Sequence, residues 1–213
     1  MKLAIFYDHV LEASEQRGLS VREVLKRAKS FGYDALECSM ESLSATPELT
    51  REMFDSVGMS IAGVYKYFNL GNDPLDDGPA GLINTAVYFK AVQLEWFADN
   101  VPGLKICFDT GNFMYADVDE RDAFIRLRDR ISHLHLKDRT LSGMPGETPK
   151  VSVTGVNMFS APVGSGILHI REILEELKAM GYDGTLGVEH FGAPDMLGYM
   201  EKSAQYVRKI WNS

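Results

Sequence analysis

Short apolar segments alternate with amphipathic segments along most of the chain, and this alternation predicts an α/β fold. Six segments have the length and the apolar content of buried strands. They are residues 3–7 (LAIFY), 35–40 (ALECSM), 60–65 (SIAGVY), 104–109 (LKICFD), 131–137 (ISHLHLK) and 185–191 (TLGVEHF). Strands that are separated by helices usually run in the same direction, so the sheet is expected to be parallel.

The helices between these strands have recognisable ends in the sequence. Ser20 is expected to cap one helix, because Glu23 stands three residues later and completes a capping box. Gly32 is expected to end that helix, and Gly181 follows a later helix whose apolar residues are 170, 173, 174 and 177. Residues 69–81 and 142–166 are rich in glycine, proline and polar residues, and they are expected to be long loops.

Length and composition favour a single domain over residues 1–213. A chain of this length in which 45% of the residues are hydrophobic can bury one sizeable core. A net charge of -8 and a pI near 5.1 argue against a nucleic-acid partner.

Apolar segments are too short for a secretory signal or a membrane span, so no membrane partner is expected. Cys38 and Cys107 lie in apolar strands and are expected to be reduced thiols, which favours a cytoplasmic location.

Polar residues that could bind a metal lie at the ends of four predicted strands. Glu37, Asp109 and Glu189 each follow an apolar run, and His135 lies near the end of residues 131–137. In parallel βα proteins the carboxyl ends of the strands meet at one edge of the sheet, and ligands bind there. Carboxylate and imidazole ligands together suit manganese, magnesium, cobalt or zinc. The pattern therefore favours a divalent metal site.

The same residues have ordinary structural interpretations. A single strand histidine, such as His133 or His135, is more often hydrogen-bonded in a core than bound to a metal. Asp109 could form an Asx-turn with the following Thr-Gly-Asn, and Glu189 could be a solvated strand end. The convergence of three such strand ends favours the metal site over these alternatives.

Four motifs together resemble the sugar phosphate isomerase/epimerase family, which has a xylose isomerase-like TIM (β/α) barrel. They are CFDTGNF, HLHLKDR, PVGSGIL and GYDGTLGVEHFG, and their order and strand-end positions carry the resemblance. The family binds one divalent metal through a glutamate, an aspartate, a histidine and a second glutamate. The resemblance implies that Asp109, His135 and Glu189 match the last three of these ligands.

The resemblance also implies roles for residues near these three. Asn112 stands where some relatives have a substrate-contacting histidine. Lys137 is expected to contact a substrate phosphate or carboxylate, with a solvated charge as the alternative. Glu37 and His9 are candidate substrate contacts, because either could supply an acid on the opposite face of the substrate. His133 lies one pleat deeper than His135 and is expected to be a packed or supporting residue.

The number of predicted strands departs from the family. The family barrel has eight strands, and its first metal glutamate closes the fifth. Residues 82–105 begin like the helix after the third strand and end like the helix before DTGN. The barrel is therefore expected to be shortened to about six strands by an internal deletion near residues 90–94. Exposed strand edges invite pairing, so a homo-oligomer is expected.

The resemblance implies a metal-dependent sugar or sugar phosphate isomerase or epimerase. In such a reaction Glu189 would remove the proton next to the carbonyl and give an enediolate. The alternative is a non-catalytic shortened barrel whose metal site is weak or absent. A metal-dependent endonuclease is disfavoured by the acidic charge and by the presence of five histidines in all, too few for a multi-metal site.

Overall fold

The computed structural model describes residues 1–44, 47–65, 82–84 and 91–213, and it contains a seven-stranded parallel sheet. The strands are β1 (Lys2–Phe6), β2 (Ala35–Ser39), β3 (Ser60–Tyr65), β4 (Leu82–Asn84), β5 (Lys105–Asp109), β6 (Ile131–Leu136) and β10 (Thr185–Val188). Their order in the sheet is β3-β2-β1-β10-β6-β5-β4. Within the described part of the chain the sheet is open, because β3 and β4 form its two edges.

The six predicted strands are confirmed, and the parallel direction holds for every strand pair of this sheet. The three-residue strand β4 was not predicted. Residues 82–84 were expected to begin a helix, and that expectation is wrong, because Leu82–Asn84 pairs with β5 over three positions. A run of three residues is too short to show a periodic pattern, so its pairing with β5 decides its conformation. The deletion near residues 90–94 stays a prediction.

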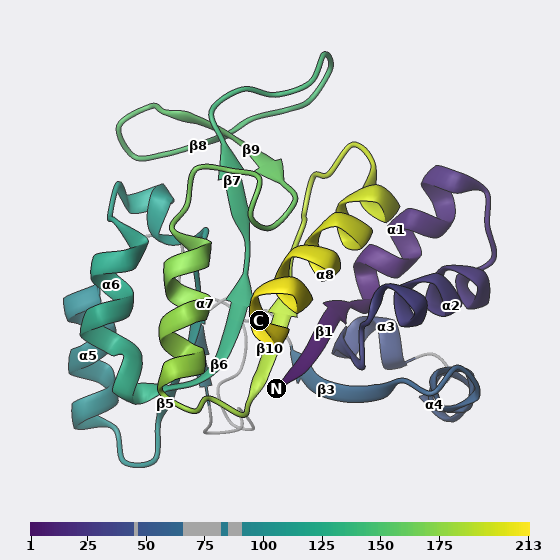
Figure 1. The fold of residues 1–213 in the computed structure, drawn as a ribbon, viewed down its shortest axis with the longest axis horizontal. Coiled ribbons are helices and arrows are strands. Elements are labelled where there is room, and N and C mark those ends of the chain that lie inside the picture. Colours follow the sequence, from purple (N-terminus) through teal and green to yellow (C-terminus); the bar gives the residue numbers. More distant parts are fainter. Residues whose placement is uncertain (45–46, 66–81, 85–90) are drawn as a thin grey trace.

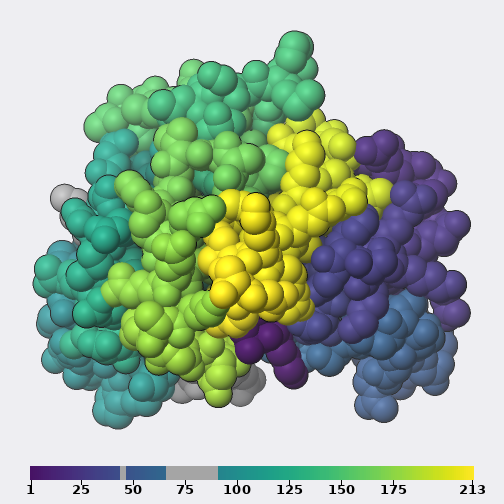
Figure 2. Space-filling view, in the orientation of Figure 1, coloured from purple at the N-terminus to yellow at the C-terminus, as the bar shows by residue number. Residues whose placement is uncertain are grey.

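Helices cover one face of this sheet (Figure 1). They are α1 (Tyr7–Arg17), α2 (Val21–Phe31), α3 (Met40–Ser44), α4 (Pro47–Ser56), α5 (Ala91–Asn100), α6 (Glu120–Leu127), α7 (Ile170–Ala179) and α8 (Met196–Asn212). In the same orientation their side chains hide most of the strands (Figure 2). The capping box of Ser20 and Glu23 is present at the start of α2, and Gly32 and Gly181 follow their helices with positive φ, as predicted.

The helices and the strands enclose one apolar core. In β1, β2, β5, β6 and β10 the fully buried residues that point toward the helices are alternate residues of the strand, and they are apolar. They include Leu3, Ile5, Leu36, Phe108, Leu134, Leu136, Leu186 and Val188, all of them fully buried. The strands therefore present their other face, which carries the polar residues, away from the helices.

The predicted loop 142–166 is partly wrong, because it contains two strands. β7 (Asp138–Thr140), β9 (Asn157–Ala161) and β8 (Lys150–Val151) form a small antiparallel sheet, which lies at the top of Figure 1. The Asp138 carboxylate accepts backbone N–H bonds from Gly164 and Gly166 at 2.8 and 2.9 Å, and these bonds attach the segment after β9. The other expected loop, residues 69–81, lies outside the described residues.

Across the described residues, no helix is both long and apolar enough to cross a membrane. Both cysteines are free and buried, as predicted.

Candidate metal centre

Asp109, His135 and Glu189 lie together at the carboxyl ends of β5, β6 and β10, which are neighbours in the sheet. The potential ligand atoms of the three side chains all lie within 4.8 Å of one another. His135 Nδ1 is 4.0 Å from Asp109 Oδ2 and 3.7 Å from Glu189 Oε2. All three residues are buried, so the solvated interpretation of Glu189 is wrong.

The two carboxylate oxygens of Asp109 have different roles. Oδ1 accepts the backbone N–H groups of Gly111 and Asn112 at 3.0 and 3.1 Å, which is the Asx-turn that the sequence suggested as an alternative. Oδ2 faces His135 and Lys137. The turn therefore fixes the orientation of the carboxylate and leaves its second oxygen directed at the cluster.

Lys137 lies inside this cluster, and the solvated interpretation of its charge is wrong. Its Nζ donates to Asp109 Oδ2 and to Asn112 Oδ1 at 2.9 Å each, and it also forms an ion pair with Glu189. Burial alone would lower the pKa of Lys137, but the charges of Asp109 and Glu189 outweigh it and raise the pKa. A cation therefore already balances the two carboxylates.

Gly111 is required where Lys137 enters the cluster. A Cβ atom at residue 111 would lie 2.7 Å from Lys137 Cγ, which is closer than carbon atoms approach without moving. The backbone of the DTGN turn therefore packs directly against the lysine stem.

Glu37 binds both strand histidines. Its Oε1 lies 3.1 Å from His133 Nε2, and its Oε2 lies 3.0 Å from His135 Nε2. Burial would raise the pKa of Glu37, but the hydrogen bonds from the two imidazoles prevail and lower it to about 2. The pKa of His135 is raised well above its usual value, because Cys107 and Glu37 outweigh the effect of burial. Both oxygens of Glu37 are therefore occupied by imidazoles.

Glu189 has the properties of a base. Its burial and the nearby charge of Asp109 raise its pKa, against the opposing charge of Lys137. A raised pKa makes a carboxylate a stronger proton acceptor at neutral pH. Its place beside His135 and Lys137 therefore suits proton transfer.

His9 is buried away from solvent, and its Nε2 accepts the backbone N–H of His190 at 2.8 Å. This bond requires an unprotonated Nε2, so the ring proton is on Nδ1. Burial and the nearby His190 and Lys137 keep the pKa of His9 well below its usual value. His9 is therefore a neutral imidazole.

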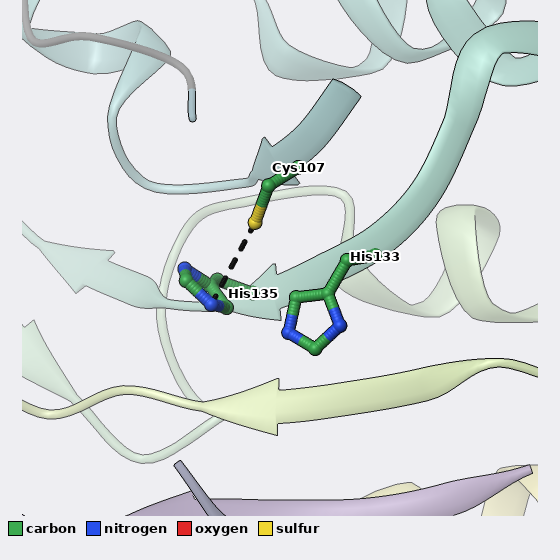
Figure 3. Close-up of side chains that lie close together, drawn as sticks. All are labelled: Cys107, His133 and His135. Carbon is green, nitrogen blue, oxygen red and sulfur yellow. Dashed lines mark hydrogen bonds between the residues drawn. The ribbon is translucent and has the colours of Figure 1, made fainter. Parts of the chain in front are cut away.

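Cys107 is a residue of this face that the sequence interpretation assigned only to the core. It lies two residues before Asp109 on β5, so the period of two places both side chains on the same face. Its Sγ is 3.6 Å from His135 Nε2 (Figure 3). The same alternation that paired His133 with His135 could have identified it.

Replacement of Gly187 by alanine is expected to lower the free energy of unfolding by about 1–3 kcal/mol, because a Cβ there overlaps Glu37 Oε1. It would also lie 3.0 Å from His135 Cδ2. Gly63→Ala is the matched control, since its Cβ would meet Glu37 only at an ordinary 3.9 Å. Urea denaturation of both variants measures the difference, and equal stabilities would show that Glu37 is not held against Gly187.

The fold and the cluster define an α/β protein whose sheet is part of a barrel and whose polar residues gather at the strand ends. The chain belongs to the xylose isomerase-like TIM barrel family, whose model matches residues 80–210.

Curated relatives match about half of the chain. Over 116 residues the chain is 34% identical to an inosose dehydratase from Lacticaseibacillus casei, a segment that covers 51% of this chain and 39% of that protein. It is 28% identical over 113 residues to an inosose dehydratase from Geobacillus thermodenitrificans, a segment that covers 50% of this chain and 38% of that protein. The match thus spans well under two thirds of these relatives.

Solved structures share the fold over nearly the whole chain. A xylose isomerase domain protein from Alicyclobacillus acidocaldarius superposes with a TM-score of 0.69 at 13% identity, covering 100% of this chain and 98% of that one. The probable 3-DHS dehydratase AsbF from Bacillus anthracis superposes with a TM-score of 0.67 at 14% identity, and the superposition covers 97% of this chain and 98% of that one. At such identities the likeness concerns the fold alone.

Proposed function

We propose that the chain is a metal-dependent sugar or sugar phosphate isomerase or epimerase, in which Glu189 removes the proton next to a carbonyl and gives an enediolate. The observation that carries the proposal is the convergence of Asp109, His135 and Glu189 at three adjacent strand ends. Glu189 is buried at the strand ends where a substrate carbonyl would be held, as a general base for a weakly acidic C–H group must be.

Asp109, His135 and Glu189 would hold the divalent ion, with manganese, magnesium, cobalt and zinc as candidates. Three protein ligands are enough for a catalytic metal that keeps positions for substrate and water. The bound ion would polarise the substrate carbonyl as a Lewis acid. The donor set fits such an ion, and the Lys137 ammonium is the group that must withdraw from the two carboxylates. Its long flexible stem permits this movement.

Asn112 and Lys137 are proposed to contact the substrate. Lys137 Nζ is bonded to Asn112 Oδ1, so a displaced Lys137 would leave both polar groups at the same side of the cluster. An ammonium and an amide there can bind a hydroxyl or phosphate oxygen.

Isomerisation on a single face is favoured over epimerisation. Epimerisation needs an acid on the opposite face, and the two candidates are poorly suited. Glu37 is engaged by His133 and His135, and His9 is a buried neutral imidazole. Glu189 alone can take the proton and return it on the same face.

Dehydration is the second candidate, because the curated relatives that match the chain are inosose dehydratases. Loss of water from a polyhydroxylated ketone begins with removal of the same proton next to the carbonyl. The bond that breaks afterwards then distinguishes the reactions.

The cytoplasmic location, the homo-oligomer and the non-catalytic alternative also stay proposals.

Exchange of substrate protons with deuterated water tests the proposed function. With manganese and a panel of ketoses, ketose phosphates and inososes, we expect deuterium to enter next to the carbonyl. Glu189→Gln is expected to slow the exchange by about 10²–10⁴-fold, the usual contribution of a general base. Glu175→Gln, on the exposed side of α7, is the matched control and should keep the activity.

The products separate the candidates. Isomerisation leaves the mass of the substrate unchanged apart from deuterium, whereas dehydration removes one water. Metal binding to Asp109 and Glu189 without exchange in any substrate would contradict both and favour the non-catalytic alternative.

A further inference from the structure

We propose a second metal site, deeper on the same face of the sheet, in which Cys107, His133 and His135 bind a zinc-like cation together with Glu37. This site is distinct from the cluster of Asp109 and Glu189 and lies one pleat below it. Borderline cations such as Zn²⁺ and Co²⁺ are the class that a thiolate, imidazole and carboxylate set prefers.

The strand register places these ligands in two layers. Cys107 on β5 pairs with His133 on β6, and Asp109 pairs with His135. The upper layer therefore carries an aspartate and a histidine, and the lower layer carries a cysteine and a histidine. The potential ligand atoms of Cys107, His133 and His135 all lie within 4.8 Å of one another. In Figure 3 the Cys107 thiol points at the His135 ring, and the His133 ring lies beside it.

The distances match those of a tetrahedral metal site. Ideal zinc–sulfur and zinc–nitrogen bonds set two tetrahedral ligands about 3.6 Å apart, and a nitrogen and an oxygen ligand about 3.3 Å apart. Cys107 Sγ is 3.6 Å from His135 Nε2. Glu37 oxygens lie 3.0 and 3.1 Å from the Nε2 atoms of His135 and His133. A cation would therefore need shifts of only a few tenths of an ångström in these pairs.

The surroundings favour a bound cation. Glu37, Cys107 and His135 are buried, so their polar atoms are removed from competing water. Cys107 would give up its thiol proton to solvent when it coordinates, which is the usual behaviour of cysteine ligands. Glu37 contributes a negative charge that helps to offset the charge of the ion.

His135 belongs to both sites, through different nitrogen atoms. Its Nδ1 faces Asp109 and Glu189, and its Nε2 faces Cys107 and Glu37. A neutral imidazole has one lone pair on its ring nitrogens for a metal, so a cation on Nε2 leaves a protonated Nδ1. The inner site is formed by Cys107, His133, His135 and Glu37, and the outer site by Asp109, His135 and Glu189. Filling of the inner site therefore prevents His135 from acting as a ligand of the outer site. If the proposed function holds, the inner cation inhibits it.

Cobalt titration of the chelator-treated protein tests the inner site. We expect visible bands of tetrahedral Co²⁺ and a near-ultraviolet thiolate-to-cobalt charge-transfer band. Cys107→Ser should lose the charge-transfer band, while Cys38→Ser is the matched control, because Cys38 is the other buried thiol. His133→Ala should weaken cobalt binding at least tenfold. Asp109→Asn should keep the band, since it alters only the outer site.

Three outcomes would overturn the proposal. One is wild-type protein that shows no charge-transfer band, a result that needs no variant to fold. Another is a band that persists in Cys107→Ser or vanishes in Cys38→Ser. The third is a band that Asp109→Asn removes, which would mean one site centred on Asp109. Circular dichroism of each variant shows that it is folded before cobalt is added. Deuterium exchange, which depends on Glu189, is scored separately.

Discussion

Glu37→Ala is expected to lower the free energy of unfolding by about 3–5 kcal/mol, the usual cost of removing one partner from a buried ion pair. Glu37 is 4% exposed, and its two oxygens bind His133 and His135. Without it, the two buried imidazoles lose the carboxylate that bonds both of them. Since small proteins have about 5–15 kcal/mol of stability in total, the variant should unfold well below the wild-type urea midpoint.

Glu48→Ala is the control for this experiment, because Glu48 is an exposed residue of α4. Its stability should stay close to that of the wild type. A Glu37→Ala variant as stable as Glu48→Ala would show that the two histidines find other partners when the carboxylate is gone.

The pKa of Glu37 gives this contribution a pH window. The pKa is about 2 in the folded protein, below the value of about 4.3 expected in the unfolded chain. A lowered pKa stabilises the folded state above the unfolded value, and the stabilisation is lost as the pH falls toward 2. The difference between wild type and Glu37→Ala should therefore shrink below pH 4.

Most of the fold could be predicted because its elements carry local signals. The strands β1, β2, β5, β6 and β10 are apolar runs, and the capping box of Ser20 and Glu23 marks the start of α2. The antiparallel strands β8 and β9 carry no such signal. Their formation depends on pairing with β7 and on Asp138, which bonds residues more than twenty positions later.

The cluster of Asp109, His135 and Glu189 could be predicted from the polar residues at the predicted strand ends, because parallel strands bring their carboxyl ends to one edge. The contacts of Glu37 could not. In the sheet, β1 and β10 separate β2 from β6, so Glu37 must reach across two strands to His135. Ala4 and Gly187 lie in register with His135 on those strands, and their small size leaves the space. Only the strand order shows that Ala4, Gly187 and His135 form one row, which the Glu37 side chain crosses.

The placement of Lys137 also depended on the three-dimensional structure. A lysine after a strand is ordinarily solvated, and its sequence position does not distinguish that state from burial. Its burial follows from two features that lie far apart in the chain: Gly111, which gives it room, and the carboxylates of Asp109 and Glu189, which balance its charge.

Wild-type protein is expected to lose stability steeply as the pH falls from 6.5 toward 3, and His190 is one source of this loss. This imidazole is fully buried, its Nε2 lies 3.0 Å from Ser203 Oγ, and burial lowers its pKa to about 3. Between these values the unfolded chain binds a proton that the folded protein does not, so stability falls by about 1.4 kcal/mol per pH unit, or about 5 kcal/mol in all. The lowered pKa of His9 acts in the same direction.

His190→Gln tests this assignment, because glutamine can still bond Ser203 and does not titrate. We expect its plot of unfolding free energy against pH to be shallower than that of the wild type by about 1.4 kcal/mol per unit between pH 6 and pH 4. His169→Gln is the control. The hydrogen bond of His169 with Glu120 raises its pKa, so its contribution is present below pH 6.5 and is lost as the pH rises. The control should therefore keep the wild-type slope in acid, and an unchanged slope in His190→Gln would mean that another buried group causes the acid sensitivity.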